Sequence, residues 1–346
     1  MPSRALRTTV LMIGMATVVI AAVVIAIVII GLLVGVRLPD SASGAPFARF
    51  EPPSGQTYLG VSTHLITTGV DGWDQAAGIP THPALYGRYT TPDGPFQPIL
   101  DEVATRPGIT PIIHWNLPMS GGQITDGSHD AYLKAQAASA KAYGKPVFVR
   151  LDWEMNGSWS KGYAPPNTTP DQFIASWNHV VAVFRAAGVV NVAWVWCPNA
   201  GDYVDAAGTR YATALWYPGD STVDWVGIDA YPQFGSDAAG NPPSGYTTGT
   251  DDLNAMANFA QAHNKPLMLG EWAPNLPNPD VASAVKVVFD WAERYPNTVK
   301  ALVYFDFARA ARDFRLSSHP VGAAVFRART ADRCRYLLDL TAPVTC

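Results

Sequence analysis

Residues 145–154 read KPVFVRLDWE, and this stretch indicates the fold. Its apolar run, residues 146–151, is typical of a strand that is buried on both faces, and acidic and aromatic residues follow the run at once. Helical patterns flank the run at residues 130–143 and 171–187. A buried strand between two helices predicts parallel strands that are joined by helical crossovers.

Short apolar runs of this kind occur eight times along the chain. They cover residues 58–62, 85–89, 110–115, 146–151, 192–197, 223–230, 266–270 and 299–305. Two further helical patterns, 251–263 and 280–295, lie between later runs, and residues 169–172 (TPDQ) form a capping-box sequence. Eight strands over roughly 290 residues, without a glycine-rich nucleotide loop, predict a (β/α)8 TIM barrel rather than an open doubly wound sheet.

The N-terminal part of the chain differs from the rest in composition. Residues 10–36 contain no charged residue, and arginines lie on both sides of them. This span exceeds the about 20 apolar residues that cross a bilayer, so we predict a single transmembrane signal anchor in the cell membrane. Residues 1–9 would be cytoplasmic, residues 37–56 a linker and residues 57–346 an extracytoplasmic catalytic domain. A cleaved signal is the alternative, because residues 41–48 (SASGAPFA) are small, and the protein would then be secreted.

Charge and motifs exclude several classes of function. Without its first 40 residues the chain has three fewer arginines and one fewer aspartate, which changes the formal net charge from −4 to −6. An acidic domain disfavours nucleic acid and anionic lipid as partners. The sequence has no C-x-x-C, H-E-x-x-H, P-loop or G-x-G-x-x-G motif, so we expect no metal ion and no cofactor. We expect the catalytic domain to be monomeric.

The three cysteines fall into two groups. Cys334 and Cys346 lie close together at the C-terminus, and outside the cytoplasm we expect them to form a disulfide bond that closes a short loop. Cys197 follows an apolar run and has no basic neighbour in the sequence, so we interpret it as a small buried side chain.

Glutamate is scarce, and two of the five glutamates end strand-like runs. Glu154 follows the fourth run and Glu271 follows the seventh, each next to a tryptophan. In a barrel of this kind the carboxyl ends of the strands form the active-site mouth, so both side chains should lie there. A protonated and an ionised carboxyl group that face each other suit cleavage of a glycosidic bond. The alternative for either glutamate is a structural ion pair.

Four segments resemble glycoside hydrolase family 26, the β-mannanase family of the clan A barrels. They are RLDWEMNGSW (150–159), VAWVWCPN (192–199), YPGDSTVDWVGIDAYP (217–232) and KPLMLGEWA (265–273). The resemblance covers nearly all of residues 58–315 and follows the order of the family's strands. It implies a retaining β-glycoside hydrolase, with an endo-acting β-1,4-mannanase as the first expectation. By the same resemblance Glu154 would be the proton donor (acid/base) and Glu271 the nucleophile.

The resemblance also implies which residues support the catalytic pair and contact sugar. Tyr231 would hydrogen-bond the nucleophile and tune its ionisation, and Arg150 would point inward and orient the carboxylates. Two roles stay open for Asn156, a contact to sugar or a hydrogen bond that caps the turn. The substrate-binding candidates are Trp115, Arg150, Asn156, Trp159, Tyr231 and Trp272. Loop packing is the alternative for the aromatic residues.

Two departures from the family pattern leave the substrate open. Trp153 stands where many members have a histidine before the acid/base, and indole offers one donor whereas imidazole both donates and accepts. Asn116 stands where the family often has a carboxylate. We therefore keep three alternatives: another β-glycan (mixed-linkage glucan, β-1,3-xylan or envelope polysaccharide), transglycosylation, and a barrel that binds glycan without hydrolysing it.

Overall fold

The structure is a computed structural model of the chain, in which residues 48–90, 94–117, 124–157, 168–204, 208–231, 249–274, 282–309 and 312–340 are described. The predicted cytoplasmic segment, the predicted anchor and the first part of the predicted linker lie outside these residues. Among the described residues, no helix combines the length and the hydropathy that a bilayer span requires. The anchor therefore stays a prediction.

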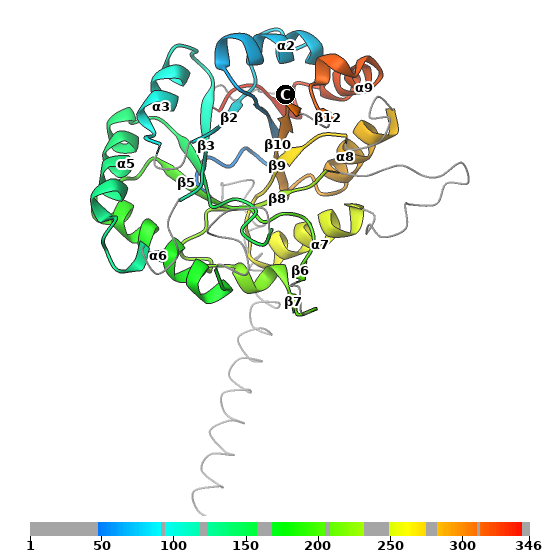
Figure 1. Cartoon of the computed structure of the whole chain (residues 1–346). Coiled ribbons are helices and arrows are strands. Elements are labelled where there is room, and N and C mark those ends of the chain that lie inside the picture. Colours follow the sequence, from blue (N-terminus) through cyan, green and yellow to red (C-terminus); the bar gives the residue numbers. More distant parts are fainter. Residues whose placement is uncertain are drawn as a thin grey trace, which may run out of the picture. The chain divides into compact units, whose positions relative to one another are not determined.

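Eight parallel strands form a closed barrel, which confirms the predicted (β/α)8 fold (Figure 1). The strands are β1 Thr57–Ser62, β2 Leu85–Tyr89, β3 Thr110–Trp115, β4 Val147–Leu151, β5 Val192–Trp196, β8 Trp225–Asp229, β9 Leu267–Trp272 and β10 Val299–Phe305. They pair in this order, and β10 pairs back with β1 through Tyr58 opposite Ala301. Each of the eight predicted runs overlaps one of these strands, because parallel strands that are covered on both faces keep a continuous apolar sequence.

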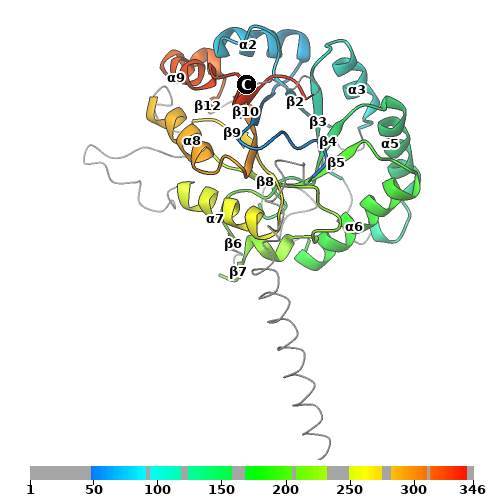
Figure 2. The ribbon, with the colours of Figure 1, turned by 180° about the vertical axis from the view of Figure 1, so that it is seen from behind.

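Helices cover the outside of the barrel in both views (Figure 1, Figure 2). They are α2 Asp71–Ala77, α3 Gln97–Ala104, α5 Asp130–Tyr143, α6 Pro170–Ala186, α7 Gly249–Ala262, α8 Ala282–Arg294 and α9 Pro320–Thr330. The four predicted helical patterns correspond to α5, α6, α7 and α8. The sequence analysis missed α2, α3 and α9, which have 7, 8 and 11 residues, because so few turns give the 3.6-residue period little room to show.

Short elements complete the described fold. They are β6 Tyr203–Val204, β7 Arg210–Tyr211, β11 Ala308–Arg309, β12 Arg312–Asp313, β13 Tyr336–Leu337, η1 Ile66–Val70, η2 Thr213–Trp216 and η3 Leu316–Ser318. The predicted capping box begins α6: the Thr169 hydroxyl accepts from the Gln172 N–H (3.3 Å), and the Gln172 side chain accepts from the Thr169 N–H (3.0 Å). Both hydrogen bonds satisfy backbone donors that a helix start leaves unpaired.

Residues along each strand alternate between two buried layers. On β4, Val147, Val149 and Leu151 pack toward the helices, whereas Phe148 joins the core inside the barrel. Arg150 is also fully buried and contacts residues of β3, β8 and β9 across the barrel interior. The period of two in a strand therefore places the Arg150 guanidinium inside the barrel, near its C-terminal end.

Residues 48–56 close the N-terminal end of the barrel. The Arg49 guanidinium donates to two backbone carbonyl oxygens at the start of β5, and the Arg49 carbonyl accepts from the Trp225 indole N–H (2.7 Å). Phe50 packs edge-on against Phe148 with ring centroids 5.8 Å apart. The predicted linker, residues 37–56, thus ends before Ala48, and residues 46–346 form one compact unit. Proline and serine suggested an exposed tether, but the arginine and the phenylalanine anchor the segment.

The cysteines are only partly described. Cys334 is disulfide-bonded, whereas Cys197 is free and buried inside the barrel. Cys346, the predicted partner of Cys334, lies outside the described residues, so the pairing stays a prediction.

Candidate active site

Three carboxylates meet at the C-terminal end of the barrel. Glu154 follows β4, Asp229 ends β8 and Glu271 lies near the end of β9. One oxygen of each carboxylate lies within 4.8 Å of an oxygen of the other two. The structure therefore brings the two predicted glutamates together and adds an aspartate that the sequence analysis did not single out.

The turn that carries Glu154 has an unusual backbone. The backbones of Asp152 (φ 45°) and Glu154 (φ 56°) both lie in the left-handed region, which residues other than glycine seldom adopt. The N–H of Asp152 donates to the Trp115 carbonyl on β3 (2.7 Å), and the N–H of Glu154 donates to the Cys197 carbonyl after β5 (2.8 Å). The two neighbouring strands thus hold a strained turn, and strain of this kind is concentrated at functional sites.

Glu271 is buried and receives hydrogen bonds on both carboxylate oxygens. The Tyr89 hydroxyl donates to Oε1 (2.5 Å), the Tyr231 hydroxyl donates to Oε2 (2.7 Å), and Arg150 Nη1 donates to Oε1 (3.1 Å). The contacts predicted for Tyr231 and Arg150 are therefore present in the structure. Tyr89 was missed, because a tyrosine that ends an apolar strand is indistinguishable from a core residue in the sequence. Three donors thus fix the positions of both Glu271 oxygens.

Arg150 balances the negative charge of the site. Its Nη2 forms an ion pair with Asp229, and its Nη1 also contacts the Gly270 carbonyl (3.2 Å). Although burial alone disfavours its charge, the neighbouring acids, Asp229 foremost, raise the pKa of the guanidinium well above its usual value. A Cβ atom at Gly270 would lie 2.8 Å from an Asp229 oxygen and 3.0 Å from Arg150 Cζ, so the close approach of these groups requires glycine there.

His114 supports this arrangement from the side of β3. Its Nδ1 accepts from Arg150 Nη1 (2.9 Å), which leaves the proton on Nε2, 2.9 Å from the Ser62 hydroxyl. Burial and the Arg150 charge lower the pKa of His114 well below its usual value, so the ring is neutral. The Tyr89 ring stacks on His114 (4.3 Å between centroids), and Trp153 packs edge-on against Tyr89 (5.1 Å). The Trp153 ring, which precedes Glu154, thus contacts the tyrosine that hydrogen-bonds Glu271.

Asn156 has a structural role in the described site. Its side-chain amide donates to the carbonyls of Asn199 (2.9 Å) and Gly201 (2.8 Å), and its oxygen accepts from the Asn199 N–H (2.8 Å). The side chain is only 3% exposed. These three bonds join the turn after β4 to the loop after β5 and give the side-chain amide backbone partners on that loop.

Two of the predicted aromatic sugar contacts are wrong. Trp115 and Trp272 are each 0% exposed and pack in the layer between strands and helices. The Trp115 indole donates to the Tyr132 hydroxyl (3.0 Å), and Trp272 packs against Tyr304 (5.0 Å between centroids). Both side chains point from their strands toward the helices. Alternate residues of a strand point to opposite faces, and an aromatic residue alone does not show which face it occupies. Trp159 lies outside the described residues.

Two groups of side chains in the described part of the chain have the spacing of metal ligands. One is the three carboxylates of the mouth, and the other comprises Asp71, Asp74 and His82. An arginine already lies in each group. Arg150 contacts Asp229 and Glu271, while Arg106 contacts Asp71 (2.8 Å) and His82 (3.2 Å). Guanidinium groups therefore supply the positive charge that a metal ion would otherwise provide.

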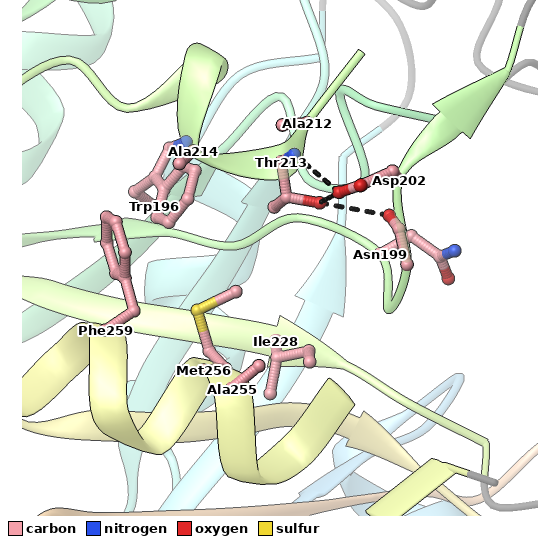
Figure 3. A pocket seen from close by; sticks show the side chains of 11 residues that line it. Trp196, Asn199, Asp202, Ala212, Thr213, Ala214, Ile228, Ala255, Met256 and Phe259 are labelled. Carbon is pink, nitrogen blue, oxygen red and sulfur yellow. Dashed lines mark hydrogen bonds between the residues drawn. The ribbon is translucent and has the colours of Figure 1, made fainter. Parts of the chain in front are cut away.

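A hollow of about 210 Å³ lies outside the barrel wall, between α7 and the ends of β5 and β8 (Figure 3). Trp196, Met256 and Phe259 line its apolar side. On its polar side the Asp202 carboxylate accepts from the Thr213 N–H (2.8 Å) and hydroxyl (3.1 Å). The three carboxylates of the mouth are not among its described lining residues, so this hollow is separate from the candidate active site.

The sequence profile described as Glycosyl hydrolase family 26 matches residues 129–302. This interval includes Arg150, Glu154, Asp229, Tyr231 and Glu271. Endoglucanase H of Acetivibrio thermocellus is 32% identical over 211 residues, which are 59% of this chain and 22% of that protein. Beta-1,3-xylanase TXYA of a Vibrio species is 29% identical over 153 residues, which are 44% of this chain and 28% of that protein. The matched parts thus span only about a quarter of these relatives.

Solved structures share the barrel. A Cellulomonas fimi endo-beta-1,4-mannanase double mutant aligns with a TM-score of 0.63 at 21% identity, over 87% of this chain and 77% of that one. The catalytic domain of the endo-beta-1,4-mannanase from Bacillus sp. JAMB-750 aligns with a TM-score of 0.61 at 17% identity, over 85% and 95% of the two chains. At these identities the alignments establish the fold.

Proposed function

The chain belongs to glycosyl hydrolase family 26, and from this premise we propose that it cleaves a β-linked polysaccharide with retention of anomeric configuration. The observation that carries the proposal is the short separation of Glu154 and Glu271. Retaining enzymes keep their two carboxyl groups about 5 to 5.5 Å apart, whereas inverting enzymes need about 6.5 to 9.5 Å to admit water. The approach of the Glu154 and Glu271 oxygens within 4.8 Å supports the retaining arrangement.

The proposed reaction has two displacements. In the first, a Glu271 oxygen attacks the anomeric carbon while Glu154 gives its proton to the leaving glycosidic oxygen. In the second, Glu154 takes a proton from water, and this water attacks the same carbon and releases Glu271. Two inversions at one carbon return the original configuration.

The surroundings of the two glutamates support this division of roles. Glu271 is 4% exposed and is held on both oxygens by Tyr89, Tyr231 and Arg150, which orient its carboxylate for attack. Glu154 lies on a turn and is partly exposed, so water can reach it after the leaving group departs. A nucleophile needs a fixed position, and an acid/base needs exchange with water.

The substrate is proposed at the level of a β-glycan, with β-1,4-mannan as the first member to test. The similar proteins carry the names endoglucanase, beta-1,3-xylanase and endo-beta-1,4-mannanase. Similarity to them therefore leaves several polysaccharide backbones as substrates to test. Trp153 packs against Tyr89 in place of the histidine that many family members have there. This change alters the polar groups near the attacked sugar, which argues for a panel of polymers.

The test uses residues 46–346 and the Glu271→Ala variant on β-1,4-mannan, mixed-linkage glucan, β-1,3-xylan and envelope polysaccharide, with released reducing ends as the readout. We expect at least one polymer to be cleaved by the parent domain and none by the variant. Glu154→Ala should lose far more activity on that polymer than on an aryl glycoside with an activated leaving group, because only the polymer needs the proton. Equal losses on both substrates would contradict the acid role.

A glycan-binding barrel without turnover is the second candidate, and Trp153 is the observation that favours it. Binding of a polymer without cleavage, by a domain with intact Glu154 and Glu271, would support this candidate. A transglycosylase would instead lengthen oligosaccharides when acceptor sugar is added. Product sizes resolved over time distinguish the three activities.

We also propose that residues 10–36 tether the protein to the cell membrane with the barrel outside the cytoplasm. The uncharged stretch between flanking arginines supports this proposal. The full chain should then remain in the membrane fraction after a high-salt wash, and external protease should reach the barrel. Recovery of the barrel in the medium would indicate the cleaved signal instead.

A further inference from the structure

A positively charged side chain stands at the rim of the mouth, just after β10. The Arg309 guanidinium carbon lies 5.3 Å from the Phe305 ring centroid and 5.1 Å from that of Phe307. Arg309 is exposed, and within the described residues its guanidinium forms no ion pair and no hydrogen bond. Its charge is therefore held in place by two aromatic rings and is open to an incoming group.

The two rings under Arg309 lead directly to the nucleophile. Phe307 contacts the Tyr89 ring (5.8 Å between centroids), and Phe305 contacts the Tyr231 ring (5.5 Å). Tyr89 and Tyr231 are the two tyrosines that hydrogen-bond Glu271. Two layers of aromatic side chains, the phenylalanines and then the tyrosines, thus lie between Arg309 and the carboxylate proposed to attack the substrate.

The charged side chains near Arg309 include Arg312, which is opposite it in the β11–β12 pair, and Asp313, which is bonded to Arg315. Arg88, on β2, is another guanidinium near this rim, and its Nε lies 3.6 Å from the Glu102 carboxylate. Burial, Arg309 and Arg88 lower the pKa of His64, so the imidazole next to Phe307 is neutral and adds no charge. Glu102 also accepts from the Ile66 N–H (2.7 Å), so its other oxygen is tied to the start of η1. Of Arg88 and Arg309, Arg309 is left without a described counter-ion.

A guanidinium on aromatic rings is well suited to a carboxylate. Its planar fork matches the two carboxylate oxygens, and such charge-assisted pairs are roughly twice as strong as hydrogen bonds between neutral groups. The rings shield one face of the cation from water, which strengthens its pairing with an anion. A sugar hydroxyl offers only a neutral acceptor, so the site should discriminate between acidic and neutral sugars.

We propose that Arg309, held over Phe305 and Phe307, forms a subsite for the carboxylate of an acidic sugar, so that the substrate is a β-glycan with uronic acid or similar residues. This inference rests on the proposed glycosidase function and specifies its substrate class. The carboxylate belongs to a sugar next to the one under attack. At the attacked sugar itself, the three carboxylates of the mouth would repel a further negative charge.

The experiment compares matched polymers with the full-length protein. Each neutral β-glucan, β-mannan and mixed-linkage glucan is paired with a partially C6-oxidised form. In this form a carboxylate replaces the primary alcohol on a minority of the sugars, so that a neutral sugar can occupy the attacked position. We expect kcat/KM to be about tenfold or more higher for the oxidised member of the preferred pair, and this preference to shrink as salt is raised. Arg309→Gln should lower kcat/KM about tenfold on the oxidised polymer and less than about threefold on its neutral partner.

Two further variants serve as controls. Arg309→Lys keeps the charge without the fork and should restore part of the preference. Arg294→Gln removes an exposed arginine at the C-terminal end of α8, at the opposite face of the barrel, and should leave both polymers unaffected. The affinity of oxidised and neutral oligosaccharides for Glu271→Gln, with and without Arg309→Gln, measures binding at the subsite in the absence of turnover.

The outcomes separate this inference from the proposed function. Cleavage that favours the neutral polymers, or an equal loss on both members of a pair in Arg309→Gln, would overturn the acidic subsite and leave the glycosidase intact. Arg309-dependent binding of oxidised oligosaccharide without any cleavage would support the subsite and contradict the glycosidase. If no oxidised oligosaccharide binds, the acidic subsite is wrong.

Discussion

The two glutamates at the mouth of the barrel are held in different ways. Hydrogen bonds from Tyr89, Tyr231 and Arg150 fix both oxygens of Glu271, whereas backbone bonds to neighbouring strands fix the turn of Glu154. A nucleophile loses most when its direction of attack changes, because reacting atoms must approach in near-attack geometry. Residues that hold Glu271 should therefore affect the rate more than the stability of the fold.

Tyr89→Phe tests this at the residue scale. The variant removes one donor to Glu271 and keeps the ring that stacks on His114. We expect kcat/KM to fall about 10-fold to 100-fold, because a hydrogen bond to a charged group contributes about 1.5 to 3 kcal/mol. The unfolding midpoint should change little. Tyr143→Phe, remote from the mouth, is the control, and a loss of stability that matches the loss of rate would contradict a positioning role.

Asn156→Ala tests the other side of the site. The substitution removes the Asn156 partner of the Asn199 carbonyl and N–H, whereas the Gly201 carbonyl still accepts from the Thr213 hydroxyl (3.0 Å). We expect the free energy of unfolding, measured in urea, to fall by about 2 kcal/mol, since unsatisfied buried groups cost about 1 to 3 kcal/mol each. If Asn156 instead contacted sugar, KM would rise while the free energy of unfolding stayed unchanged.

At the residue scale, the sequence predicted what depends on local pattern. Glu154 and Glu271 were found because a polar residue after a buried strand is visible without a structure. Tyr89 and Asp229 were missed because each looks like the last residue of a core strand, and only the closed barrel brings them to Glu271 and Arg150. The sugar contact of Trp115 was predicted wrongly because the sequence does not show to which face of its strand a tryptophan points.

At the scale of elements, residues 48–56 close the base of the barrel. Trp225 donates to the Arg49 carbonyl, and the buried Lys300 amine donates to the Pro53 carbonyl (3.0 Å). A chain that starts at Thr57 would lose these acceptors and the packing of Phe50. We expect it to be about 3 kcal/mol less stable in urea than a chain that starts at Pro46. Equal unfolding midpoints would show that the segment is a passive tether.

The elements were predicted in proportion to their length. The capping box and lengths of 13 residues or more made α5, α6, α7 and α8 visible, whereas the missed helices α2, α3 and α9 have at most 11 residues. The boundary of the N-terminal segment was placed too late, because composition shows that a stretch is polar but does not show that single residues such as Arg49 dock onto distant strands.

At the scale of the whole molecule, Asp306 should make stability depend on pH. Burial raises the pKa of this carboxyl to about 7, and its oxygen accepts from the Leu316 N–H (2.7 Å). The unfolded carboxyl loses its proton near the usual value, so the folded state binds more protons between about pH 4 and pH 7. The stability that Asp306 contributes is therefore complete below about pH 4 and is lost as pH rises through about 7.

Asp306→Asn isolates this contribution. The amide oxygen can still accept from Leu316, but the side chain no longer titrates. We expect the free energy of unfolding of the parent protein to fall by about 2 to 3 kcal/mol more between pH 5 and pH 8 than that of the variant. Parallel pH profiles of the two proteins in urea denaturation would contradict the raised pKa.

The barrel as a whole was predictable because eight buried strands repeat one pattern in one order. The side chains around the mouth of the barrel were not predictable, because side chains from several loops converge there. Trp153 is one of them, and its role depends on its neighbours in space. The described contacts place Trp153 against Tyr89, which no pattern along the chain indicates.

The retaining reaction is the central claim, and the configuration of the first product tests it most directly. Proton NMR of a cleavage reaction, recorded before the new reducing end mutarotates, identifies the anomer that the enzyme releases. Two displacements by Glu271 and Glu154 predict that the β-anomer appears first and the α-anomer only later. An α-anomer that appears first would mean a single displacement by water and would contradict the roles assigned to both glutamates.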